Sequence, residues 1–116
     1  MDELLIDRID TLLDHIEKID NDIKGMSFED FCKSDMLIRA TCFSLSQIGE
    51  QMINLERHFK KANLSIPWKY ARDMRNIIVH VYNKVNYKIV FDTLHEDLPP
   101  LKESFLAIKT KLMAEA

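Results

Sequence analysis

The feature that most restricts the fold is a regular spacing of apolar residues at the start of the chain. Between Asp2 and about Lys24, apolar side chains recur in alternating steps of three and four, at Leu5, Ile9, Leu12, Ile16, Ile19 and Ile23. This period places all of them on one seam of a long α-helix. The seam needs a partner to bury it, so the segment predicts a helical bundle or a dimer face.

Helix start and stop signals divide the next part of the chain. Gly25 ends the first helix, and Ser27 is an N-cap residue for a short helix over 28–32. Apolar spacing then predicts a second long amphipathic helix from Asp35 to about Ala62. This helix is expected to pack antiparallel to the first.

The second half of the chain predicts three more segments. Pro67 is placed as the first residue of a helix that carries Trp68 and continues to about residue 82. A further helix is expected over 87–95, after which Asp97 and Pro99 open a last one to about residue 113. The predicted class is therefore all-α, an antiparallel bundle of four to five helices that forms a single domain over 1–116.

Length and charge narrow the function. A chain of 116 residues with 47% hydrophobic residues can bury one core, and a second copy would help to cover a remaining apolar face. The formal net charge is −3. This charge offers no general attraction for nucleic acid, so any binding of nucleic acid would need a local basic patch.

No metal, cofactor or membrane segment is expected. Cys32 and Cys42 have neither CxxC spacing nor flanking ligands, and His15, His58 and His95 have no partners at ligand spacing. The chain opens with acidic residues, and no apolar run is long enough to cross a bilayer. The expected location is the cytoplasm.

The predicted helix after Pro67 carries a concentrated set of reactive residues. Arg72, Asn76 and His80 follow one another in steps of four and form one stripe, which Arg75 flanks. The opposite arc is apolar and is expected to be buried in the bundle; it contains Tyr70, Ala71, Met74, Ile77, Ile78, Val81 and Tyr82. Packing alone therefore does not require the polar stripe.

Two interpretations of this stripe are open. It can be an ordinary solvated helix face, or a site for an anion, because Asp73 is the only acid nearby in sequence. In the second interpretation, His80 is the general acid or base for attack of a ribose 2′-hydroxyl on the adjacent phosphate. Arg75 stabilises the developing charge, and Asn76 orients the phosphate or the imidazole. Cleavage would leave a 2′,3′-cyclic phosphate.

Two residues on the preceding long helix are candidates for supporting roles. Gly49 lies inside the helix, where glycine costs about 1 kcal/mol relative to alanine, so a close approach of another helix is expected there. Glu50 can pair with Arg72 or Arg75, either to position them or as a plain surface charge.

Three lysines lie close to the motif in sequence. Lys69 is a candidate for substrate binding beside Arg72. Lys60 and Lys61 can extend an RNA-binding rim or complement the end of a helix, and the second role is favoured for both.

The motif Arg75-Asn76-x-x-x-His80-x-Tyr82 resembles the signature of the HEPN ribonuclease superfamily, and specifically of HepT-like toxins. Three further segments match similar residues in HepT-like sequences, so the resemblance covers most of the chain: Ile48-Gly49-Glu50, Ile66-Pro67-Trp68 and Leu98-Pro99. The resemblance implies a homodimer whose two motifs face each other and form one metal-independent RNA-cleaving site.

The resemblance also implies a partner, a minimal nucleotidyltransferase antitoxin that adds AMP to the tyrosine two residues after the histidine. Here that residue is Tyr82, although its place on the apolar arc also fits a core tyrosine. RNA, with tRNA among the candidates, is then the expected substrate, and DNA is not. The alternative function is a non-catalytic helical partner of a nucleotidyltransferase that holds a nucleotide on the same polar face.

Overall fold

A computed structural model of the chain describes residues 2–80 and 85–115, and within them it contains helices and no strand. The prediction of an all-α bundle is confirmed. In chain order the elements are α1 (Asp2–Ile23), α2 (Phe28–Lys33), α3 (Asp35–Phe59), α4 (Trp68–His80), α5 (Tyr87–Asp92), the π-helical turn η2 (Thr93–Asp97) and α6 (Leu98–Glu115).

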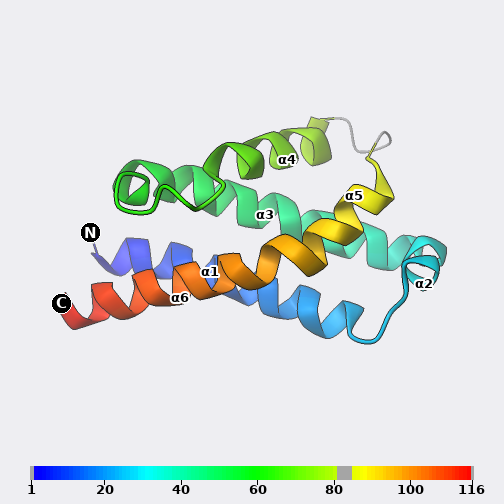
Figure 1. Cartoon of the computed structure of the whole chain (residues 1–116), viewed down its shortest axis with the longest axis horizontal. Helices are drawn as coiled ribbons and strands as arrows, with labels where there is room; N and C mark the ends of the chain where they lie inside the picture. Colours follow the sequence, from blue (N-terminus) through cyan, green and yellow to red (C-terminus); the bar gives the residue numbers. More distant parts are fainter. Residues whose placement is uncertain (1, 81–84, 116) are drawn as a thin grey trace.

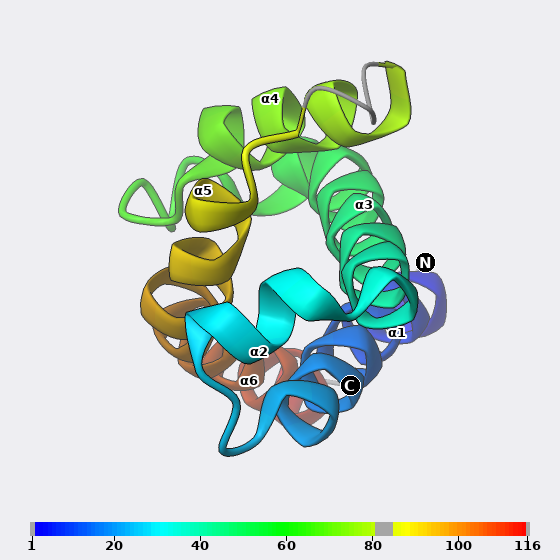
Figure 2. The same ribbon diagram turned by 90° about the vertical axis from the view of Figure 1, so that its right-hand side faces the viewer.

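The long helices form an antiparallel bundle (Figure 1). Helices α1 and α4 run in one direction along the long axis, and α3 and α6 run in the other. Helix α3 packs against both α1 and α4, while α6 packs against α1. Seen along the bundle axis, α4 lies on the side opposite α1, and α2 crosses one end (Figure 2). Helix α4 is therefore an outer element held mainly by α3.

The seam of α1 is buried as its spacing predicts. Each of its six apolar residues is at most 7% exposed, and Ile9, Leu12 and Ile16 are fully covered. Gly25 follows the helix with φ +74°, a left-handed conformation that glycine adopts without steric cost. Ser27 then accepts a hydrogen bond from the Asp30 backbone N–H at 3.0 Å, which starts α2.

The start of α4 is fixed by a buried indole. Trp68 is 3% exposed, and its Nε1–H donates to the Asn63 carbonyl oxygen at 3.0 Å. Its ring meets Phe105 of α6 edge-on, with centroids 5.9 Å apart. The Pro67 carbonyl accepts the hydrogen bond of the Ala71 N–H, so Pro67 lies immediately before the helix and not at its first position. Trp68 thereby anchors α4 to the bundle.

The predicted break between a helix over 87–95 and a last helix opened by Asp97 and Pro99 is wrong. Helix α5, η2 and α6 follow one another without a gap from Tyr87 to Glu115. A proline ring clashes with the carbonyl four residues earlier, so Pro99 normally stops a helix. Here the Leu98 N–H donates to the Thr93 carbonyl five residues back, and this wider turn lets the helix continue through the prolines.

Counted as one helical path, the stretch over 87–115 brings the described chain to five helices, within the predicted four to five. None of the described helices is both long and apolar enough to span a membrane.

Candidate functional site

The site is built where α4 crosses α3 at Gly49. A Cβ at this position would lie 2.8 Å from the Arg75 Cβ and 3.0 Å from the Ala71 carbonyl oxygen. Carbon atoms do not approach to 2.8 Å, so any side chain here would push the helices apart. The predicted close approach at Gly49 is confirmed, and the side chain that occupies the space is Arg75 itself.

Arg75 is held by an acid from α3. Its Nη1–H donates to Glu50 Oε2 at 2.7 Å, with 27% of the arginine side chain exposed. The Arg75 Nε is buried and has no hydrogen-bond partner among the described residues. A guanidinium has five N–H donors, and Glu50 contacts only one of its nitrogens. Glu50 therefore positions Arg75 and leaves further donors for another ligand.

Arg72 has a matching carboxylate that the sequence did not indicate. Its Nη1–H donates to both carboxylate oxygens of Glu56, at 2.6 and 2.7 Å. Glu56 follows Gly49 by two helical turns and thus lies on the α3 face that Gly49 marks as the contact with α4. This spacing is a sequence signal that Glu56 lies on the contact face, but which α4 residue Glu56 meets depends on the register between the two helices.

Asp73 is the only acid of α4, but in space the polar stripe also has acids from α3 beside it. Glu50 and Glu56 pair with Arg75 and Arg72, and Asp73 pairs with Lys69 at 2.8 Å. Glu50 pairs with Arg75, which is one of the two partners that the sequence suggested for it and lies 25 residues later in the chain. Glu56 was missed because it comes from α3, 16 residues before Arg72. The stripe is consequently a set of oriented cations and not a row of unpaired ones.

The remaining motif residues follow along α4. Asn76 is exposed on the helix surface. Position 80 comes one helical turn after position 76 on the same face and is the last residue of α4. Tyr82 lies outside the described residues. The structure thus brings Arg72, Arg75 and Asn76 together on one face that leads to the backbone of His80.

The apolar arc of α4 is only partly buried. Met74 and Ile78 are 8% and 5% exposed, as predicted, whereas Tyr70 and Ile77 are 40% and 44% exposed. The prediction of a wholly buried arc is wrong because α4 is an outer helix whose partners, α3 and the segment over 85–98, cover only one side of it. Val79, on the motif face, is 54% exposed. Apolar surface therefore remains on both sides of the motif.

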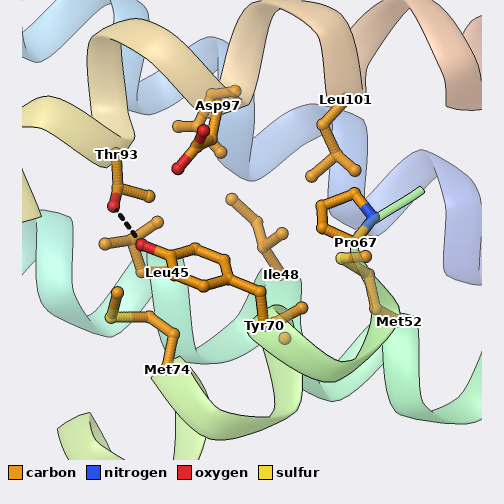
Figure 3. A pocket seen from close by; sticks show the side chains of 12 residues that line it. Leu45, Ile48, Met52, Pro67, Tyr70, Met74, Thr93, Asp97 and Leu101 are labelled. Carbon is orange, nitrogen blue, oxygen red and sulfur yellow. Dashed lines mark hydrogen bonds between the residues drawn. The ribbon is translucent and has the colours of Figure 1, made fainter. Parts of the chain in front are cut away.

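A small cavity lies behind α4, between α3, η2 and α6 (Figure 3). It encloses ≈ 40 Å³, and Tyr70 closes it on one side by a 2.7 Å hydrogen bond between its hydroxyl and that of Thr93. Asp97 lies at its edge, and burial raises the pKa of this carboxyl although the Thr93 hydroxyl opposes the rise. The cavity has room for about two waters and not for a nucleotide. It is a packing defect beside the site.

Other reactive side chains do not join the site. Burial raises the pKa of the Cys42 thiol to about 11, so this thiol stays protonated at neutral pH, and Cys32 is an exposed free thiol. The His15 ring of α1 forms a hydrogen bond with the Ser44 hydroxyl of α3. The described residues include no group of three or more potential metal ligands.

Comparison with known proteins identifies the class. The model of the family described as ribonuclease HepT-like matches residues 12–108. A relative from Caldanaerobacter subterraneus subsp. tengcongensis, named as a putative RNase, is 36% identical over 103 residues, which cover 89% of this chain and 92% of the relative. A relative from Thermococcus cleftensis, named as a probable ribonuclease HepT, is 31% identical over 99 residues, or 85% and 90% of the two chains. No solved structure gives a significant match.

The fold and the comparisons together define a helical-bundle nuclease of the HEPN type. The chain belongs to the HepT-like ribonuclease family. The resemblance drawn from the motif over 75–82 is thereby confirmed.

Replacing Gly49 tests the crossing that supports the site. We expect Gly49→Ala to destabilise the protein by about 1 kcal/mol, because an overpacking cost of about 1–3 kcal/mol exceeds the helix-propensity gain of about 1 kcal/mol. RNA cleavage should fall by about 10²-fold, since Arg75 is displaced. Urea unfolding and a cleavage assay measure the two effects.

The matched control is Ala40→Gly, at an exposed position of the same helix. It reports the propensity difference between glycine and alanine in α3 without any clash. If Gly49→Ala stabilised the protein by as much as Ala40→Gly destabilises it, the close contact would not constrain the helices.

Proposed function

We propose that this chain is a metal-independent endoribonuclease toxin whose site consists of Arg75, Asn76 and His80. The observation that carries the proposal is the placement of Arg75: it is fixed by Glu50 across Gly49, one residue from an exposed amide and on the helix that ends at His80. A guanidinium held in this way can stabilise charge on a phosphate without first losing conformational freedom.

The proposed reaction is an internal transesterification of RNA. The ribose 2′-oxygen attacks the adjacent phosphorus, the bond to the 5′-oxygen breaks, and the products are a 2′,3′-cyclic phosphate and a free 5′-hydroxyl. A base removes the 2′-hydroxyl proton, and an acid protonates the leaving oxygen; His80 supplies one of these roles. The nucleophile belongs to the substrate, so the reaction needs no metal-activated water, and DNA, which lacks the 2′-hydroxyl, is not cleaved.

Arg72 and Lys69 are proposed to bind the substrate alongside the reacting phosphate. Both lie on α4 with a carboxylate partner, and the Arg72 side chain is 38% and that of Lys69 80% exposed. Phosphate can therefore approach either cation from solvent. Cellular RNA, with tRNA among the candidates, is the proposed substrate, and the cytoplasm is the proposed site of action.

Substituting the motif tests this proposal. We expect His80→Ala to lower RNA cleavage by about 10²–10⁴-fold, the usual contribution of a general acid or base, and Arg75→Ala by about 10²–10³-fold. Wild type should remain active in EDTA and leave cyclic-phosphate ends. The assay uses purified tRNA and a generic RNA, with analysis of the product ends.

Equal activity of wild type and His80→Ala would contradict the assignment of His80. No cleavage by folded wild type whose mass shows no added AMP would instead favour the alternative, a non-catalytic partner that holds a nucleotide on this face.

A homodimer in which two motifs form one composite site is part of the proposal. Val79 and Ile77 support it, because each exposes about half of an apolar side chain beside the motif, at 54% and 44%. Apolar surface next to polar functional groups is typical of an interface. A second copy would cover these residues and add its own Arg72 and Arg75 to the same cleft.

We expect wild type to sediment as a dimer and Val79→Glu to sediment as a monomer with the helix content unchanged. The monomer should lose RNA cleavage because only half of the composite site remains. Met113→Glu is the control, since Met113 is also exposed, at 58%, but lies at the far end of α6. Dimerisation and full activity of Val79→Glu would remove this face from the interface.

The proposed partner is a nucleotidyltransferase antitoxin that silences the nuclease by adding AMP to Tyr82. When the two proteins are produced together, we expect the intact mass of this chain to rise by one AMP and cleavage to be lost. Tyr82→Phe should keep its unmodified mass and its cleavage activity. Modification of Tyr82→Phe to the same extent as wild type would place the acceptor at another residue.

A further inference from the structure

A cluster of basic side chains lies beside the motif face, at the end of α3. It surrounds an open groove of ≈ 380 Å³ between α3 and α4, lined by Ile53, Glu56, Arg57, Lys60, Lys61 and Arg72. Four of these six side chains are cationic and one is anionic, in a chain whose net charge is −3. The groove is thus positively charged, although the chain as a whole is negatively charged.

The single acid of the groove organises two of its cations. Glu56 is only 15% exposed and accepts hydrogen bonds from both Arg72, at 2.6 Å, and Lys60, at 3.2 Å. Arg57 and Lys61 have no ion-pair partner within residues 2–80 and 85–115. After these pairings, the groove retains positive charge that no described carboxylate neutralises.

The position of the groove connects it to the motif. Arg72 belongs to both, and it precedes Asn76 by one turn and His80 by two. Eight residues of helix span about 12 Å, the rise of roughly three or four stacked nucleotides at about 3.4 Å each. A strand whose phosphate lies at the motif would therefore reach the groove within a few nucleotides.

We propose that this groove, through Arg57, Lys60 and Lys61, binds the phosphate backbone of the RNA strand that enters the site. The inference rests on the proposed nuclease function and adds a substrate-binding groove outside the reacting residues. Ile53, which is only partly exposed, is the single apolar residue among those given as lining the groove, and none of the exposed large apolar residues lies there. The groove therefore offers little of the apolar anchoring typical of a protein interface. A polyanion needs only the charge that the groove supplies.

The favoured role of Lys60 and Lys61 as complements to a helix end accounts for part of this arrangement. Lys60 does follow the last turn of α3 and pairs with Glu56. A role at the helix end does not account for Arg57 and Arg72, which line the same groove from two different helices.

The test is the salt dependence of RNA binding. Wild type is compared with the triple variant Arg57→Gln/Lys60→Gln/Lys61→Gln, in which glutamine keeps the helix propensity of the replaced residues. The ligand is a fluorescent single-stranded RNA with 2′-O-methyl groups, which cannot be cleaved through the 2′-hydroxyl. The logarithm of the RNA association constant falls linearly with the logarithm of the salt concentration, and each phosphate contact contributes about 0.7 to the magnitude of that slope. With three contacts removed, the slope of the variant should be smaller in magnitude than that of wild type by about 2.

The matched control is Lys18→Gln/Lys24→Gln/Lys33→Gln, which removes the same charge at the opposite end of the bundle. It should bind with the slope of wild type. Equal slopes for the groove variant and the control, or no binding of this RNA by wild type, would overturn the proposal. A groove variant that changes only the sedimentation of the protein would assign the groove to self-association and would also overturn it.

Cleavage of unmodified RNA is measured separately, so the two proposals fail in different ways. If the nuclease function is wrong, wild type does not cleave RNA, even if the groove variant shows a weaker salt dependence of RNA binding than wild type. If only the groove is wrong, wild type cleaves and His80→Ala does not, while the slopes of groove variant and control agree.

Discussion

The contact between α3 and α4 at Gly49 is the constraint on which the site depends. Helix α4 is an outer element, and without a close crossing its arginines would extend into solvent. The missing side chain of Gly49 admits the Arg75 Cβ and the Ala71 carbonyl, and at that separation Glu50 reaches Arg75. Two turns further along α3, Glu56 reaches Arg72 in the same way. The absence of one methyl group thus fixes two guanidiniums.

Features governed by local rules could be predicted from the sequence. The seam of α1, the left-handed Gly25 and the Ser27 cap each depend on neighbours within one or two helical turns. Gly49 is informative for a different reason: glycine costs stability inside a helix, so its presence there predicts a compensating contact.

Features that depend on the register between helices could not be predicted. The pair formed by Glu56 and Arg72 joins residues 16 positions apart, and only the antiparallel crossing at Gly49 aligns them. The exposure of Ile77 depends on which side of α4 faces the bundle, a property that a helical wheel does not contain. The π-helical turn before Pro99 is also a compromise with packing, because sequence rules alone end a helix there.

The arrangement of charge is compatible with the proposed RNA site on a chain whose net charge is −3. Glu50 and Glu56 reduce the net positive charge of the motif face, which by itself weakens long-range attraction for RNA. They also hold Arg75 and Arg72 in place, so less side-chain entropy is lost when a phosphate binds. Attraction over distance then has to come from cations that are not needed for positioning. Arg57 and Lys61, on the same side of the bundle and without carboxylate partners among the described residues, meet that requirement. In this proposal, the arginines paired with glutamates orient the phosphate, and the unpaired cations of the groove attract the RNA. Arg72 lies in both groups of residues.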